Sequence, residues 1–395
     1  MVYFDNNATS RVLPEVREAM LPYFSEAYFN PTSVVGELHD TGKPLREARN
    51  SLATLIDCCS EEIVLTSGAT ESNNWVLQSI ARHALRKNGM CHLVLSAIEH
   101  PSVLKVASYL AEEESGVAVD LAPVNSEGIL DLAAFQSLLR PDTTLVSVML
   151  ANNETGVIQP VAEAAAIAKR INKGCVVHTD ATQAVGKITL SLQNSLRDVD
   201  LLSLSGHKFH GPKGIGALFI RSGIDLIPLF HGGGQQGGAR PGTENPALAA
   251  GIAKAAEIAI HNLDDRRLKR LRDSLEGTLS DLGVTVLGVG APRLPTTSLL
   301  LFADLDAEML VHQLLEAGFA TSTGSACSSG SDTPSHVVLA MGINYGSARG
   351  ALRISLSRES AEKDVSGFLE NVRRFLSGSK MVLKNVAELR SDIGN

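Results

Sequence analysis

The sequence is poor in cysteine and in aromatic residues. Its 395 residues include 5 cysteines and 4% aromatic side chains, with a single tryptophan. The cysteines are odd in number and include no Cys-x-x-Cys spacing, which argues against a disulfide framework or a zinc ribbon and predicts no metal site. We therefore expect reduced thiols and a cytoplasmic location.

Long apolar runs and an excess of basic residues are also missing. No apolar run approaches the roughly 18 residues of a membrane helix, and Met1 is followed by no basic and apolar leader. The formal net charge is −8, whereas surfaces that bind nucleic acids are normally basic. The basic cluster at 266–270 lies in a charged helical pattern and indicates a solvated helix face. We expect neither a membrane nor a nucleic acid as a direct partner.

The sequence does contain a regular alternation of strand and helix patterns. This alternation predicts an α/β fold with a mainly parallel sheet, and a hydrophobic content of 44% supports a sizeable core. We expect seven strands, at 63–66, 92–96, 117–121, 145–150, 176–180, 201–205 and 215–220. The helices expected between them lie at 71–86, 102–114, 133–139 and 162–172.

A Gly/Pro-rich stretch, His231–Pro246, then interrupts the periodicity and predicts a long functional loop. After it, a second and smaller α+β domain is expected. Residues from Ser377 onward are polar and charged and are expected to form a frayed tail or a docking segment. The elements expected in the smaller domain are helices at 247–261 and 263–282 and strands at 297–302, 319–322 and 352–356.

The strongest local signal is Ser205–Gly214, directly after a buried-looking strand. Taken alone, Lys208 is either an exposed loop lysine or a lysine in a cleft, where burial lowers an amine's pKa and makes it a nucleophile or base. Asp180 follows another strand and, taken alone, also reads as a helix N-cap. Strand ends in a parallel sheet share one edge, so the two side chains converge. Pyridoxal phosphate requires such a lysine and carboxylate pair.

A phosphate group needs its own site, and Thr66–Asn74 is a turn that opens a helix after a strand. A helix N-terminus offers free N–H groups to anions, although the same residues also serve capping alone. Thr70 and Ser205 would add hydroxyls. His100, at a strand-to-helix junction, is either structural or able to stack on a flat ring. Asn152–Gly156 is a turn on the same expected edge.

Cys327 lies in a run of small polar residues, Thr321–Ser331, that predicts a mobile, accessible loop. An accessible thiolate attacks sulfur as well as carbon. The other four cysteines lie in or beside apolar patterns and are expected to fill space: Cys58, Cys59, Cys91 and Cys175.

Together these motifs resemble the cysteine desulfurases of the nitrogen-fixation and iron–sulfur-assembly type, class V aminotransferase-like enzymes of fold type I that use pyridoxal phosphate. The similarity runs from Tyr3 to about Phe375. The motifs that carry it, in chain order, are Thr66–Ser72, Glu99-His100, Asn152–Gly156, Asp180–Gly186, Ser205–Gly214, Gly242–Asn245, Gly324–Ser328 and Leu352–Leu356.

The resemblance implies roles around the cofactor ring. Lys208 would bind the cofactor covalently and serve as a catalytic base, Asp180 would pair with the pyridine nitrogen, and Gln183 would bond the ring hydroxyl. His100 would stack on the ring and take part in catalysis. The phosphate would be held by Ala69, Thr70, Ser205 and His207, and by Thr243 from the other subunit of a homodimer.

The resemblance also implies a reaction and a domain division. L-cysteine, held by Asn153 and Arg353, would become L-alanine, and Cys327 would carry the persulfide to an iron–sulfur scaffold or another acceptor protein. A large domain would span 15–258. The remaining parts would be a small domain of 1–14 and 259–380, its cysteine loop at 322–334, and a tail at 381–395.

Some positions depart from the pattern of that family. Gln236-Gly237 stands where the family usually has Glu-Arg, Val35 where it has histidine, and Phe29 where it has glycine. None of these positions is assigned above to the cofactor or the thiol.

The sequence is also compatible with other hypotheses about function. Gly232–Gly237 matches a dinucleotide fingerprint, but Pro241 and Pro246 follow it and no helix opens at its third glycine. His231–Gly234 mimics an esterase oxyanion loop, but the chain has no Gly-x-Ser-x-Gly elbow. The closer alternatives are a selenocysteine lyase or aminotransferase of the same fold, and a non-catalytic sulfur carrier that docks on scaffolds.

Overall fold

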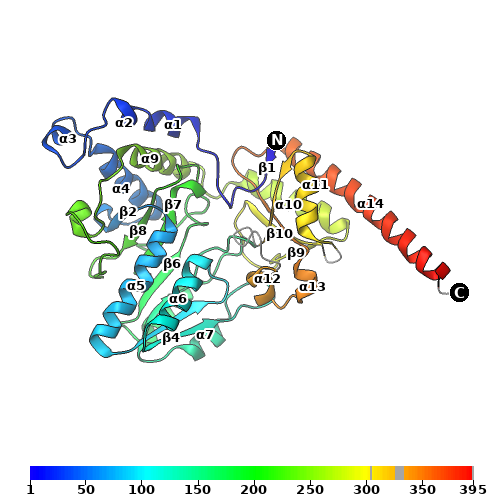
Figure 1. The fold of residues 1–395 in the computed structure, drawn as a ribbon, viewed down its shortest axis with the longest axis horizontal. Helices are drawn as coiled ribbons and strands as arrows, with labels where there is room; N and C mark the ends of the chain where they lie inside the picture. Colours follow the sequence, from blue (N-terminus) through cyan, green and yellow to red (C-terminus); the bar gives the residue numbers. More distant parts are fainter. Residues whose placement is uncertain (303–304, 325–332, 394–395) are drawn as a thin grey trace.

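The computed structural model describes residues 1–302, 305–324 and 333–393, with side chains described up to residue 377. A larger layered unit lies beside a smaller one, and helix α14 (Glu362–Ile393) extends away from the smaller unit (Figure 1). The segment expected as a tail at 381–395 is thus helical up to Ile393, since it is rich in the helix formers Leu, Lys, Glu and Ala.

The larger unit is built on a seven-stranded sheet in the order β2-β8-β7-β6-β5-β3-β4. All neighbours pair in parallel except β8, which is antiparallel to β7 and β2. The strand expected at 145–150 ends at Ser147. The α/β prediction is confirmed, with strands β2 (Ile63–Thr66), β3 (Cys91–Ser96), β4 (Val117–Ala122), β5 (Thr143–Ser147), β6 (Val176–Asp180), β7 (Leu201–Ser205) and β8 (Gly216–Ile220).

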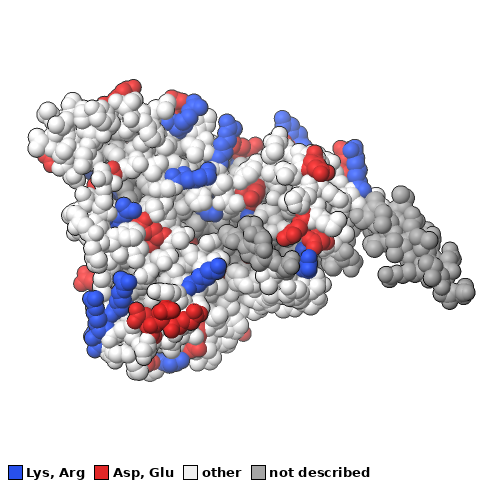
Figure 2. Space-filling model, viewed as in Figure 1, with Lys and Arg blue, Asp and Glu red and all other residues white. Residues whose placement is uncertain are grey.

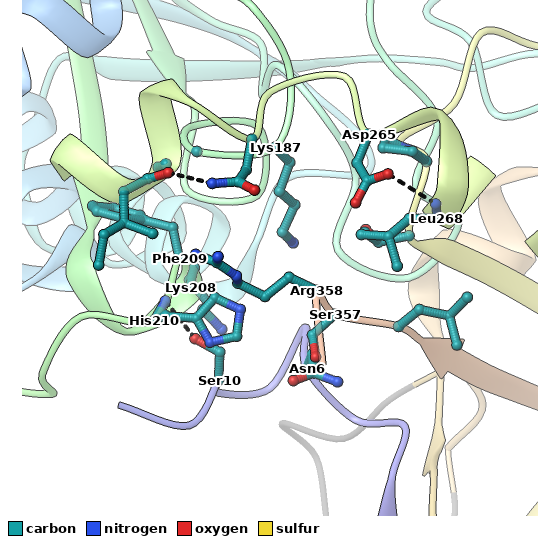
Figure 3. A pocket seen from close by; sticks show the side chains of 17 residues that line it. Asn6, Ser10, Lys187, Lys208, Phe209, His210, Asp265, Leu268, Ser357 and Arg358 are labelled. Atoms are coloured by element: carbon teal, nitrogen blue, oxygen red, sulfur yellow. Dashed lines mark hydrogen bonds between the residues drawn. The ribbon is translucent and has the colours of Figure 1, made fainter. Parts of the chain in front are cut away.

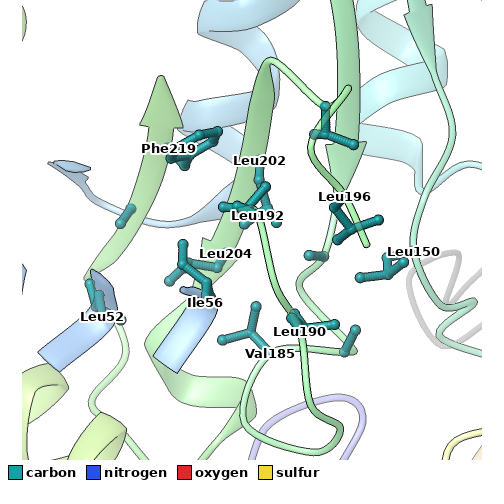
Figure 4. Packing of buried hydrophobic residues seen from close by; sticks show 14 of the residues in the cluster. Leu52, Ile56, Leu150, Val185, Leu190, Leu192, Leu196, Leu202, Leu204 and Phe219 are labelled. Carbon is teal, nitrogen blue, oxygen red and sulfur yellow. The ribbon is translucent and has the colours of Figure 1, made fainter. Parts of the chain in front are cut away.

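Helices cover both faces of this sheet because its strands are apolar on both sides. On one face, Leu202, Leu204 and Phe219 meet Leu52 and Ile56 of α4 (Figure 4). On the other face, α5 and α6 bury a cluster around Trp75. The helices are α1 (Pro14–Met20), α2 (Pro22–Ser25), α3 (Val34–Leu38), α4 (Lys43–Ile56), α5 (Ala69–Asn88), α6 (Pro101–Glu113), α7 (Leu132–Leu138), α8 (Val161–Ile171) and α9 (Pro246–Ile260).

The smaller unit holds a four-stranded antiparallel sheet, β12-β13-β10-β9, and a two-stranded pair, β1-β11. The N-terminal segment packs into this unit, because Phe4 is fully buried and its ring meets Phe319 and Phe368. The elements are β1 (Val2–Tyr3), α10 (Arg266–Asp281), β9 (Thr285–Leu287), β10 (Thr297–Leu301), α11 (Ala307–Glu316), β11 (Phe319–Ala320), β12 (Ser322–Thr323), α12 (His336–Ala340), α13 (Tyr345–Ala348) and β13 (Ala351–Ser355).

The surface offers no broad region of one charge on the face seen in Figure 2, where acidic and basic side chains are interspersed. Among the helices of the described residues, none combines the length and the apolar character that a membrane span requires.

Gln236, one of the departures from the family pattern, covers part of the sheet edge. β2 is an edge strand, and the backbone N–H of Leu65 in β2 donates to Gln236 Oε1 at 2.8 Å, while Gln236 Nε2 donates to the Leu65 carbonyl oxygen at 2.8 Å. Arg49 also donates to Oε1, at 3.1 Å. The amide therefore pairs with the strand as a neighbouring backbone would, and it anchors the 231–246 loop to the sheet.

Replacing Gln236 with alanine is expected to expose the Leu65 amide. Hydrogen exchange at the Leu65 N–H should accelerate about fivefold, the equivalent of one net hydrogen bond. Gln236→Glu is the matched control, because a carboxylate accepts from the Leu65 N–H but cannot donate to its carbonyl, so its effect should be smaller. Equal exchange rates in all three proteins would contradict this role for the glutamine.

Candidate active site

Most of the residues singled out from the sequence line one cavity between the two units. It encloses about 480 Å³, within the range of roughly 300–1,000 Å³ that is typical of small-molecule sites. It lies at the carboxyl ends of β6 and β7 and at the starts of α5 and α6. The residues brought together there are Ala69, Thr70, His100, Asn153, Asp180, Gln183, Ser205, His207, Lys208 and Arg353.

Lys208 ends a short 3₁₀ turn, Gly206–Lys208, that follows β7. Its Nζ donates to the backbone carbonyl oxygens of Asn7, at 2.6 Å, and Ala8, at 2.9 Å. The turn is tight: a Cβ on Gly211 would stand 2.8 Å from the Gly206 carbonyl oxygen, so only glycine fits. The lysine is thus an amine within the cavity, held by the N-terminal segment.

Asp180 is the last residue of β6 and is 4% exposed. Its Oδ1 accepts from the Thr182 backbone N–H at 2.9 Å, and its Oδ2 accepts from Asn73 Nδ2 at 2.8 Å. Asn73, buried on α5, gives its other hydrogen to Ser102 Oγ at 2.9 Å. Charge-assisted bonds to both oxygens fix the direction of the carboxylate.

His100 caps the start of α6, where its Nδ1 accepts from the Ser102 backbone N–H at 3.1 Å. Burial lowers the pKa of His100, an effect that the nearby Asp180 carboxylate opposes and the Lys208 charge reinforces. A neutral ring with Nδ1 as acceptor carries its proton on Nε2. Burial and the neighbouring Lys208 also lower the pKa of His207, to about 4.

The start of α5 has the features of an anion site. Gly68 precedes the 20-residue helix with a φ of +152°, and a Cβ there would stand 3.4 Å from Ser205 Oγ. The Ser205 hydroxyl therefore faces the first turn, whose N–H groups have no helical partners. Glu71 supports this turn, because it accepts from the Ser67 N–H at 2.9 Å and pairs with Arg240 at 2.9 Å.

Arg353 brings a second anion-binding group to the cavity from β13. Only 2% of the residue is exposed. Its Nη2 donates to Asp5 Oδ1 at 2.6 Å and its Nη1 to the Asn153 carbonyl oxygen at 3.2 Å. The buried Nε has no hydrogen-bond partner among the described residues. The guanidinium as a whole lines the cavity, and a guanidinium binds a carboxylate well.

One expected site residue lies elsewhere, and another is not described. Thr243 is exposed on the loop before α9 and does not line the cavity. Cys327 lies outside the described residues. Where the chain is described, no cluster of His, Cys, Asp and Glu side chains is arranged to hold a metal ion.

Of the four other cysteines, three are buried or half-buried, as expected of residues that fill space. Burial raises the pKa of the Cys91 thiol to about 11 and those of Cys58 and Cys175 to about 12, so all three are poor nucleophiles. Cys59 is exposed, and the prediction that it fills apolar space is wrong. It is the N-cap residue of the 3₁₀ turn Ser60–Glu62, and the chain is exposed at this position.

Three polar residues that organise the site were not predicted from the sequence: Asn7, Asn73 and Lys187. Asn7 lies near the start of the similarity, and Asn73 lies in the turn Thr66–Asn74, but neither was assigned a role. Asn7 is 201 positions from Lys208, and no periodicity reports a contact of that separation. The signal that the sequence offers for Lys187 is its position four residues after Gln183.

Comparison with known proteins places the chain in a class. The profile of the aminotransferase class-V family matches residues 2–368, so the chain belongs to that family, which depends on pyridoxal phosphate. Within this class its relatives are the cysteine desulfurases. It is 44% identical over 374 residues to "Cysteine desulfurase" of Gluconacetobacter diazotrophicus, covering 93% of this chain and 92% of the relative. It is 41% identical over 377 residues to "Cysteine desulfurase NifS" of Azotobacter vinelandii, with 94% and 91% covered.

Solved structures agree with this placement. A NifS-like protein superposes with a TM-score of 0.87 at 38% identity, covering 95% of this chain and 99% of the other. The structure of SspA in complex with cysteine has a TM-score of 0.80 at 32% identity, with 90% and 99% covered.

The residues of the cavity fit pyridoxal phosphate. Lys208 offers an amine to the aldehyde, and the buried Asp180 carboxylate suits a protonated pyridine nitrogen. The first turn of α5 and Ser205 suit the phosphate, and the absence of a side chain at Gly68 leaves room beside the Ser205 hydroxyl.

Glu154, in the turn that also carries Asn153, lies beneath the cavity and is 3% exposed. Its Oε2 accepts from Ser335 Oγ at 2.5 Å and lies against Gly324. Burial raises the pKa of Glu154 from 4.5 to about 7, and the Ser335 hydrogen bond and the Arg353 charge only partly oppose this shift.

This raised pKa predicts a loss of stability with rising pH. From about pH 4.5 to 7 the unfolded chain ionises Glu154 while the folded chain keeps it protonated, so the contribution of this group to the free energy of unfolding falls by roughly 3 kcal/mol. Glu154→Gln should lack that fall. Urea unfolding of both proteins at pH 5 and pH 8 tests this, since other buried acids such as Glu99 cancel in the comparison. Parallel pH profiles would contradict the assignment.

Proposed function

We propose that this protein is a cysteine desulfurase that converts L-cysteine to L-alanine and hands the sulfur to an acceptor thiol. The observation that carries the proposal is the single cavity in which the Lys208 amine, the Asp180 carboxylate and the Arg353 guanidinium meet. The identity of 44% to a cysteine desulfurase supports it. SspA, a structural relative, was solved in complex with cysteine, which supports cysteine as the substrate.

The residues that would hold the cofactor form two groups, one at its ring and one at its phosphate. Asp180 would bond the pyridine nitrogen, Gln183 would bond the ring hydroxyl, and His100 would stack on the ring. The phosphate would be held by Ala69, Thr70, Ser205 and His207. When bound, pyridoxal phosphate supplies an electron sink for the carbon that loses its proton.

The chain's own groups then orient the substrate and move its protons. Arg353 and Asn153 hold the substrate carboxylate, and the existing bonds of Arg353 to Asp5 and Asn153 keep the guanidinium in place for that task. The Lys208 amine lies in the same cavity and would take the Cα proton as a general base. His100, neutral and protonated on Nε2, lies in the same cavity and is a proton donor or acceptor for the substrate.

The sulfur atom of the substrate is removed by nucleophilic attack on it. The Cys327 thiolate attacks the substrate sulfur, the carbon–sulfur bond breaks, and a sulfur–sulfur bond forms on Cys327. The electron pair of the broken bond stays on the substrate carbon, which takes a proton and becomes alanine. One cysteine and one thiol thus give one alanine and one persulfide, with no outside oxidant.

The persulfide passes to an acceptor thiol, either on an iron–sulfur scaffold or on another sulfur-accepting protein. Since the transfer needs reduced thiols, the proposed location is the cytoplasm. Selenocysteine lyase is the second candidate, because the same groups serve removal of selenium.

The proposed assembly is a homodimer. Large apolar side chains are exposed along α1 to α3, including Phe24, Tyr28, Val34 and Leu38, and grouped apolar exposure of this kind is typical of an interface. Thr243 is exposed as well and is free to reach the phosphate of a second copy. We propose that each site is completed by the partner's loop.

Alanine release from L-cysteine under reducing conditions tests the activity. Cys327→Ser should lower the rate about 100-fold or more, because the attacking thiol is lost. Cys59→Ser is the matched control, since Cys59 is also exposed and should leave the rate unchanged. Release at the full rate from Cys327→Ser would exclude the thiol mechanism, and no release from the parent protein would favour a sulfur carrier. Faster turnover of L-selenocysteine would favour the lyase.

Mixed dimers test the sharing of the site. Lys208→Ala and Thr243→Ala homodimers are each expected to be impaired. In a heterodimer of the two chains, action of Thr243 across the interface leaves one site intact, so about half of the parent activity should return. If Thr243 serves its own chain, both sites remain defective and no activity returns.

A further inference from the structure

A second lysine lies beside Lys208 and has no role in the proposed reaction. Lys187 follows Gln183 by four residues, in the turn after β6. It lines a smaller cavity of about 60 Å³ at the junction of the two units (Figure 3). Lys208 borders both this small cavity and the candidate active site.

The Lys187 amine is bound to two side-chain amides. Its Nζ lies 2.7 Å from Gln183 Oε1 and 2.9 Å from Asn7 Oδ1. Burial lowers the pKa of Lys187 well below its ordinary value, and the charges of Lys208 and Arg353 lower it further. Placing this amine in a buried site beside two cations costs free energy, which its two hydrogen bonds must offset.

Backbone carbonyls fix which atom of each amide faces Lys187. Gln183 Nε2 lies 3.0 Å from the Asn7 carbonyl oxygen, and Asn7 Nδ2 lies 3.0 Å from the Asn153 carbonyl oxygen. A carbonyl oxygen only accepts, so both of these contacts must come from NH₂ groups. The two amide oxygens therefore face Lys187, and the amine donates to both.

The two residues that Lys187 holds are also connected to Lys208. The Asn7 carbonyl oxygen accepts from both Gln183 Nε2 and Lys208 Nζ. Asn7 Nδ2 also donates to Thr297 Oγ1 at 2.9 Å, on β10 of the smaller unit. Without the Lys187 amine, each amide oxygen loses its donor, and either amide is then able to rotate.

We propose that Lys187 is a positioning residue that keeps the NH₂ of Gln183 directed to the ring oxygen of pyridoxal phosphate and the carbonyl of Asn7 directed to Lys208. The proposal rests on the cofactor site described above and not on the sulfur chemistry. The other charged and titratable groups around Lys187 are Lys208, Arg353, His207, His210, Asp265 and Arg358.

The test is a titration of the apoprotein with pyridoxal phosphate, without any cysteine, so that its outcome is independent of the desulfurase activity. Lys187→Met should bind about fivefold more weakly, the equivalent of one hydrogen bond. The absorption band of the bound cofactor should titrate at a higher pH, because the ring oxygen loses a donor. Lys254→Met, which removes an exposed lysine on α9, should change neither quantity.

A double variant separates positioning from general damage. If Lys187 acts through Gln183, the loss of affinity in Lys187→Met with Gln183→Ala should be smaller than the sum of the two single losses. Lys187→Gln keeps an N–H donor and should retain part of the parent spectrum, and it replaces Lys187→Met if thermal melting shows that the latter is unfolded. An unchanged affinity and titration midpoint, or fully additive losses, would overturn the proposal.

Discussion

The contact on which the site depends is the one between the N-terminal segment and the turn that holds Lys208. The Asn7 and Ala8 carbonyl oxygens accept from the Lys208 amine, and the Ser10 backbone N–H donates to the His207 carbonyl oxygen at 2.9 Å. The same segment is pinned to the smaller unit by Phe4. The lysine of the larger unit is therefore oriented by an N-terminal segment anchored in the smaller one, which couples the chemistry to the packing of the two units.

This arrangement also explains the charge balance of the cavity. Lys187, Lys208 and Arg353 lie close together, and burial together with the charges of Lys208 and Arg353 lowers the pKa of Lys187 well below its ordinary value. Asp5 pairs with Arg353, and Asp180 is held by neutral donors. The Arg353 guanidinium and the free N–H groups of the first turn of α5 suit a ligand that is itself an anion, such as a phosphate ester or an amino-acid carboxylate.

The sequence predicts those parts of the site that follow from sheet geometry. Asp180 and Lys208 each come directly after a strand of a parallel sheet, and strand ends of such a sheet share one edge, so their convergence is predictable. Asn73 and Asn7 are different, because their roles depend on which donors and acceptors meet across 107 and 201 positions of the chain. Burial of Cys91 follows from its strand, whereas the exposure of Cys59 depends on a single 3₁₀ turn that apolar patterning does not reveal.

Arg353 illustrates how the fold prepares for a ligand. Two of its nitrogen atoms already donate, one to Asp5 and one to the Asn153 carbonyl oxygen, and these bonds fix the plane of the guanidinium. The side chain is only 2% exposed, yet it lines the cavity in which a carboxylate would bind. Since the Asp5 bond holds the group before the ligand arrives, little side-chain entropy remains to be lost on binding. The acidic partner thus orients the arginine before the carboxylate of a ligand binds to it.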